Sequence, residues 1–182
     1  MKILAISGSL RAGSLNTLLL QRLADMAGAR ATVEFADIGA LPHYNQDIDG
    51  DARPAEATAF IEAVQGADGL VIATPEYNYS ISGALKNALD WASRPAYKSP
   101  LAKKPTAMLG ASMSPVGTAR AQAHLRQILG GTVTRLFPYP EVLIGAAHTK
   151  FDAQGQISDA STQAHLERFV SAYLDWVAAQ AG

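Results

Sequence analysis

The sequence predicts an α/β fold in which a five-stranded parallel sheet is covered by helices on both faces. Short, continuously apolar segments alternate along the chain with segments in which apolar residues recur every three or four positions. A chain of 182 residues without repeats, low-complexity tracts or linkers suits one domain with a sizeable core. We therefore expect residues 1–182 to form a single three-layer, doubly wound domain.

The expected elements follow one another in strict alternation. The strands are five short apolar segments: residues 3–6, 32–35, 70–73, 106–109 and a broken stretch around 133–144. The helices are segments with an apolar stripe: residues 15–26, 54–66, 83–93, 118–130 and 166–177. Because ligands in such sheets bind beyond the carboxyl ends of the strands, the loops after the first, third and fourth strands are the first candidates for a site.

Composition excludes several kinds of partner and site. The hydrophobic content of 48% and charged content of 17% are typical of a globular protein, and a net charge of -1 favours neither nucleic acid nor an acidic membrane surface. No apolar stretch is long enough for a membrane span or a signal peptide. The absence of cysteine fits a cytoplasmic protein. The four histidines are scattered, so we expect no metal site.

The loop after the first strand has the composition of an anion cradle, GSLRAGSLN at residues 8–16. Its glycines allow close backbone approach, its serines offer hydroxyls, Arg11 adds charge, and a helix begins directly after it. Ser14 stands where a Walker A loop needs lysine, and Leu10 stands where a dinucleotide fingerprint needs glycine. These departures favour a single phosphate. The alternative is a turn in which Ser14 merely caps the helix.

The loop after the third strand is rich in tyrosine, PEYNYSISGALKNALDW at residues 75–91. Pro75 stiffens the chain, Tyr77 and Tyr79 offer flat faces, and Asn78 can meet the polar edge of a ring. A planar heterocycle would fit there. The alternative is an ordinary loop whose tyrosines pack on the domain.

Together these two motifs resemble the NADPH-dependent FMN reductase family, which includes chromate and quinone reductases. The resemblance continues through GTAR at 117–120 and HLRQIL at 124–129, so it covers much of the chain in the expected order. It implies a flavodoxin-like fold with strand order 2-1-3-4-5 and non-covalent FMN. Position by position, it implies that two groups of residues surround the phosphate and the isoalloxazine ring: Ser9, Arg11, Ser14, Leu15 and Asn16, then Pro75, Glu76, Tyr77, Asn78 and, from the loop after the fourth strand, Ser112.

Our hypothesis for the activity is a two-step exchange in which NADPH or NADH delivers hydride to the flavin, leaves, and is replaced by an oxidised acceptor. The reacting centre is the flavin, so no catalytic side chain is predicted. Quinones are the most natural acceptors, and chromate, azo compounds and free flavin are alternatives. The rival hypotheses are a flavodoxin-type electron carrier, against which the near-neutral charge argues, and a non-catalytic FMN or NADPH sensor.

The resemblance also implies a homodimer, with a homotetramer as the alternative. The helix at 83–93 has one small apolar face, with Ala84, Leu85, Ala88 and Leu89, that could pack on its own sheet or on a second subunit. Arg120 and Glu141 resemble positions that join subunits in related quinone reductases, with a local ion pair as the alternative. Ala123 stands where those relatives can carry tyrosine, which weakens the inference of a tetramer.

Overall fold

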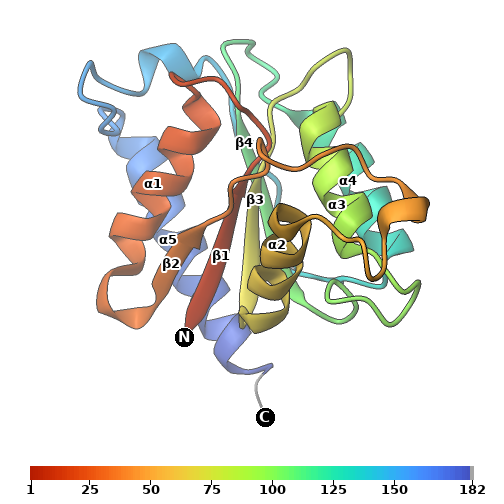
Figure 1. The fold of residues 1–182 in the computed structure, drawn as a ribbon. Helices are drawn as coiled ribbons and strands as arrows, with labels where there is room; N and C mark the ends of the chain where they lie inside the picture. Colours follow the sequence, from red (N-terminus) through yellow and green to blue (C-terminus); the bar gives the residue numbers. More distant parts are fainter. Residues whose placement is uncertain (181–182) are drawn as a thin grey trace.

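The computed structural model describes residues 1–180 as a three-layer α/β domain (Figure 1). Its parallel sheet has the order β2-β1-β3-β4-β5, with β6 also paired to β4. The strands are β1 (Lys2–Ser7), β2 (Thr32–Phe35), β3 (Gly69–Ala73), β4 (Pro105–Ala111), β5 (Arg135–Leu136) and β6 (Val142–Ile144). The predicted fold class and strand order are confirmed. From β1 the chain adds β2 on one side of the sheet and β3 to β5 on the other, so the strand order reverses between β1 and β3.

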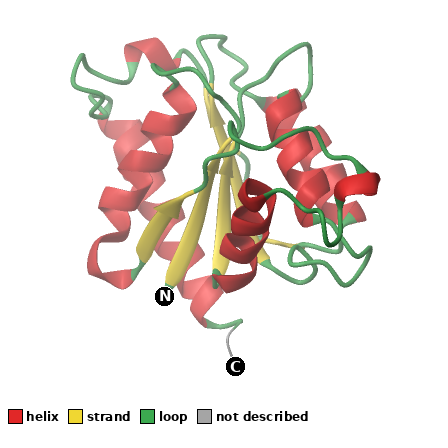
Figure 2. Ribbon diagram, viewed as in Figure 1, coloured by secondary structure: helices red, strands yellow, loops and turns green. Residues whose placement is uncertain are grey.

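The helices divide between the two faces of the sheet. They are α1 (Leu15–Ala27), α2 (Ala55–Gly66), α3 (Gly83–Ala92), α4 (Ala119–Gly131) and α5 (Ala160–Ala178). Helices α1 and α5 cover one face, and α2, α3 and α4 cover the other (Figure 2). Each face has its own apolar cluster, because β1, β3 and β4 send alternate side chains to opposite sides.

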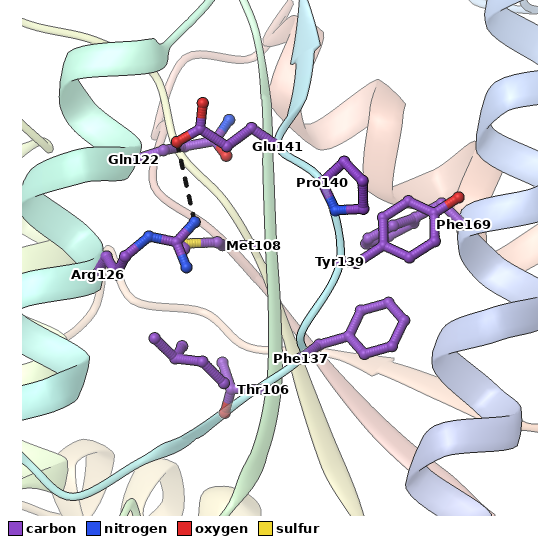
Figure 3. Close-up of a pocket in the computed structure, with 10 residues that line it drawn as sticks. Thr106, Met108, Gln122, Arg126, Phe137, Tyr139, Pro140, Glu141 and Phe169 are labelled. Carbon is purple, nitrogen blue, oxygen red and sulfur yellow. Dashed lines mark ion pairs between the residues drawn. The ribbon is translucent and has the colours of Figure 1, made fainter.

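The fifth strand position is divided between two short strands. Arg135 and Leu136 pair with the start of β4, while Val142 to Ile144 pair with its end. Between them the chain leaves the sheet, and Phe137 and Tyr139 pack against Phe169 of α5 (Figure 3). The prolines at 138 and 140 lack the N–H that a strand ladder needs, so this segment cannot continue the pairing.

The apolar face of α3 packs within its own domain. Leu85, Ala88 and Leu89 are at most 1% exposed and belong to the cluster on the α2–α4 face, and only Ala84 is partly exposed. Of the two alternatives for this face, packing on its own sheet is therefore the one found. Of the four residues, only Ala84 is left to meet a second subunit.

Candidate flavin site

A pocket of about 370 Å³ lies at the carboxyl ends of β1, β3 and β4. In Figure 1 these ends lie at the top of the sheet, opposite the N-terminus. The lining includes nine of the ten residues predicted for the flavin site: Ser9, Arg11, Ser14, Leu15, Asn16, Pro75, Glu76, Tyr77 and Ser112. Asn78 does not line it, whereas Ala111 and Met113 do and were not predicted. Three loops far apart in the sequence thus form one cavity, as the topology requires.

At Gly8, the loop after β1 closely approaches the loop after β3. A Cβ atom at this position would lie 2.9 Å from Cδ of Pro75 and 3.2 Å from Cδ2 of Leu85. The hydroxyl of Ser82, which caps α3, donates to the Gly8 carbonyl oxygen at 2.5 Å. Glycine is therefore required here by space, and the hydrogen bond fixes the two halves of the pocket to each other.

The first loop offers donors at the start of α1. Within residues 1–180, no hydrogen-bond acceptor meets the backbone N–H groups of Leu15 and Asn16, which belong to the first turn and have no intrahelical partner. The Ser14 hydroxyl accepts from the N–H of Thr17, so the predicted capping role is confirmed, and its own proton remains to be donated. The guanidinium of Arg11 is exposed and donates to the Gly13 carbonyl at 2.8 Å. These donors suit a dianion.

Asn16 has a structural role that the sequence did not reveal. Its buried amide accepts from the N–H of Ala111 at 2.9 Å and donates to the Ala111 carbonyl at 3.0 Å. This pair of hydrogen bonds joins the start of α1 to the end of β4, across 95 residues of chain. Asn16 therefore holds the pocket together through its side chain, and its backbone N–H remains the group available to a ligand.

The loop after β3 forms a tight turn. Tyr77 and Ser80 exchange two backbone hydrogen bonds, and the two residues between them, Asn78 and Tyr79, have φ values of 50° and 66°. Two successive left-handed residues between paired strand ends are typical of a type I′ turn. Asparagine tolerates this conformation and tyrosine does so less well. Asn78, in this turn, is not among the residues that line the pocket with Pro75 and Tyr77.

Glu76 fixes this loop to the start of α4. Its carboxylate accepts from the backbone N–H groups of Arg120 and Ala121 at 2.9 and 3.2 Å, and from the Arg120 guanidinium at 3.0 Å. The Arg120 guanidinium also lies 4.4 Å from the centre of the Tyr79 ring. Partial burial acts to raise the pKa of Glu76, but the hydrogen bonds from Arg120 and Ala121 outweigh it and hold the pKa below its ordinary value. Thr118 provides no side-chain cap, so Glu76 supplies it.

The ion pairs around α4 differ from the local pair considered for Arg120 and Glu141. Arg120 pairs with Glu76, while Glu141 lies 3.9 Å from Arg126 (Figure 3). Arg126 and Glu141 line a small cavity of about 10 Å³ beside β4. This cavity has room for one water molecule at most. Arg120 and Glu141 therefore do not contact each other within one chain.

Among the described residues, no three His, Asp or Glu side chains are grouped as metal ligands. In the same residues, none of the helices has the length and apolar character needed to cross a bilayer.

Comparison with known proteins agrees with this geometry. The family model for NADPH-dependent FMN reductases matches residues 1–149, which include all three loops of the pocket. The chain belongs to the NADPH-dependent FMN reductase family. It is 45% identical over 176 residues to an NAD(P)H-dependent FMN reductase of Pseudomonas aeruginosa, covering 97% of this chain and 95% of that protein.

Two other known proteins are similar to this chain over nearly their whole length. A 2-hydroxy-1,4-benzoquinone reductase from a Burkholderia species is 44% identical, with 97% of this chain and 96% of the relative covered. The structure of FerB, a flavoenzyme NAD(P)H:(acceptor) oxidoreductase from Paracoccus denitrificans, superposes with a TM-score of 0.90 at 36% identity, covering 97% and 96% of the two chains. The protein is therefore an oxidoreductase that uses FMN and NAD(P)H, as the FMN reductase family does. These similarities are explained without an electron carrier or a non-catalytic sensor.

Proposed function

We propose that the protein transfers two electrons from NADPH or NADH to quinones or similar oxidised acceptors, with FMN held in the pocket at the carboxyl ends of β1, β3 and β4. The observation that carries this proposal is the meeting of unpaired helix N–H donors with flat side chains in one cavity. When bound, the isoalloxazine supplies the hydride chemistry. Resemblance to a 2-hydroxy-1,4-benzoquinone reductase supports quinones as acceptors.

The two ends of the pocket suit the two ends of FMN. Ser9, Arg11, Ser14 and the N–H groups of Leu15 and Asn16 would hold the phosphate, since they offer several donors and one positive charge. Pro75, Glu76, Tyr77, Asn78 and Ser112 would border the ring, with Asn78 contributing through the turn and not through the pocket wall. These groups bind and orient; none of them has to accept a proton from the substrate.

Replacement of Arg11 by alanine tests the phosphate end. Loss of an exposed, charge-assisted hydrogen bond should weaken FMN retention about fivefold to tenfold. The fold should persist, because Arg11 lies outside the core. Arg168→Ala, which removes an exposed arginine from α5, is the matched control and should leave FMN affinity unchanged. Unchanged affinity in Arg11→Ala, measured by fluorescence titration, would place the phosphate elsewhere.

The activity is tested by stopped-flow absorbance with the purified flavoprotein. NADPH or NADH should bleach the flavin band at least as fast as the protein turns over with benzoquinone as acceptor. If neither nucleotide bleaches the band near the rate of turnover, the proposed exchange is wrong. Steady-state oxidation with benzoquinone, free FMN and no acceptor then ranks the acceptors.

We also propose that the protein is a cytoplasmic homodimer that associates through the rim of this pocket. Leu10, Tyr77, Met113 and Val116 are 45–62% exposed and lie in the three loops that form the pocket. Large apolar side chains gathered at one site favour burial by a partner. Leu10→Lys should shift the mass measured by light scattering towards a monomer, whereas Val133→Lys, at an equally apolar exposed position elsewhere, should not.

A further inference from the structure

A second pocket, of about 460 Å³, lies between α2 and the segment 93–104 that joins α3 to β4. Every ionisable side chain that lines it is basic: Arg53, Arg94, Lys98 and Lys104. The remaining lining is small, apolar or neutral, with no carboxylate among the residues described there. In a protein whose net charge is -1, four cations around one cavity are a local excess of positive charge.

The four cations are only partly neutralised by the protein. Arg53 pairs with Asp49 at 2.7 Å, and Lys104 donates to the carbonyl oxygens of Gln65 and Ala67 at 3.0 and 2.5 Å. Among the residues described, Arg94 and Lys98 have no carboxylate within 4 Å.

The charges of Arg94 and Lys104 differ in their surroundings, because Arg94 is exposed and Lys104 is partly buried. The Arg94 guanidinium lies 5.4 Å from the ring centre of Tyr44. Burial lowers the pKa of Lys104, although Asp68 acts in the opposite direction, so this charge is incompletely stabilised. The pocket therefore keeps an unmatched positive charge.

Ser99 provides an independent sign of a missing partner. This residue is 6% exposed and lines the pocket, and its buried hydroxyl has no hydrogen-bond partner among residues 1–180. A buried polar group without a partner costs free energy, so such groups are rare unless a ligand or water satisfies them. A hydroxyl can donate to an anionic oxygen while arginine and lysine surround the charge.

We propose that this pocket binds the phosphate group of a small phosphorylated molecule, at a site separate from the flavin pocket. The two pockets share no lining residue. Lys104 precedes the first residue of β4 and Ala111 is its last, and seven residues of extended chain span roughly 20 Å. In Figure 1 the segment after α3 lies at the foot of the sheet beside the end of α2, opposite the loops that form the flavin pocket.

Titration calorimetry with inorganic pyrophosphate, on protein saturated with FMN, tests the proposal. Saturation fills the first phosphate cradle, and a repeat in Arg11→Ala shows whether that cradle contributes to the measured heat. We expect one site whose affinity falls as salt is raised. Ser99→Ala should weaken it about tenfold and Lys98→Ala about threefold or more, because each removes one contact to a charged group. Lys103→Gln, in the same segment but outside the pocket, should bind as the parent does.

A stability measurement separates a binding role of Ser99 from a structural one. Without pyrophosphate, Ser99→Ala should be as stable as the parent or more so, since its hydroxyl has no partner to lose. With pyrophosphate, the rise in Tm should be smaller in this variant. Absence of binding to the FMN-saturated protein, or equal affinity in Ser99→Ala and the parent, would overturn the proposal.

Competition then identifies the source of the phosphate. Displacement of pyrophosphate by NADP⁺ but not by NAD⁺ would assign the site to the 2′-phosphate of the nicotinamide coenzyme. Displacement by neither would assign it to a free phosphate compound. Either result supports a phosphate site, and both are independent of whether FMN occupies the first pocket, because the readout is the heat of pyrophosphate binding.

Discussion

Replacement of Glu76 by glutamine removes the charge that caps α4 but keeps the size of the side chain. The carboxylate receives two backbone N–H groups and the guanidinium of Arg120. Loss of a helix cap costs about 1 kcal/mol. An ion pair that is still partly exposed, as this one is on the Arg120 side, contributes about 0.2–1 kcal/mol. Because glutamine can still accept one N–H, we expect a loss of about 1 kcal/mol for Glu76→Gln and nearer 2 kcal/mol for Glu76→Ala.

The assay is urea unfolding of the FMN-saturated protein, with Tm as a second measure. For a chain of this size, 1 kcal/mol corresponds to about 2–4 °C in Tm. Arg120→Ala and the double variant complete a cycle, in which the two single losses should sum to more than the double loss. A fully additive cycle would refute the contribution of the ion pair, and an unchanged Tm in Glu76→Ala would refute the assignment of Glu76 as the cap.

The pKa of Glu76 gives the pH dependence of this contribution. Its pKa in the folded protein is depressed, so the carboxylate stabilises the fold at pH values above its ordinary pKa of about 4.5, and this stabilisation is lost as the pH falls through the folded value. The difference in stability between the parent and Glu76→Gln should therefore be full at pH 7 and should shrink below about pH 4.5. A difference that grows on acidification would contradict the sign of the shift.

Three further substitutions test how the pocket and the sheet are held together. Gly8→Ala should place a methyl group 2.9 Å from Pro75, costing about 1–3 kcal/mol in stability and weakening FMN retention in the fluorescence titration. Asn16→Ala should cost about 1–3 kcal/mol in urea unfolding, because both backbone groups of Ala111 lose a buried partner. Tyr173→Phe should cost about 1 kcal/mol without changing FMN affinity, since its hydroxyl donates to a buried strand carbonyl at 2.6 Å, far from the pocket.

The sequence predicted most of the fold because the periodic patterns are local. Helices α1 to α4 and the first four strands lie within two residues of their predicted ranges, whereas α5 begins six residues earlier than expected. The capping residue Asp159, whose side chain accepts from Thr162, marks that start. The division of the last strand position depends on two prolines and on aromatic packing against α5, and periodicity alone could only indicate a broken stretch.

The candidate site was predicted less completely, since its hydrogen bonds join distant segments. Glu76 and Arg120 are 44 residues apart, and Asn16 and Ala111 are 95 apart. No local pattern connects such pairs. The motif resemblance placed Glu76 and Asn16 at the pocket, but their capping and clamping roles appear only when the loops are brought together. Asn78 lies in the predicted loop, within the left-handed turn at 78–79, but it does not line the pocket.

The hydrogen bonds within the first loop limit what any single side chain can contribute to FMN binding. Arg11 already donates to Gly13, the Ser14 hydroxyl already accepts from Thr17, and the Asn16 amide is engaged with β4. Among the described residues, the donors with no other partner belong to the backbone at the start of α1, and no substitution except by proline removes them. Single variants at the phosphate end should therefore weaken FMN binding by about tenfold at most. A substitution that displaces the helix start should weaken it further.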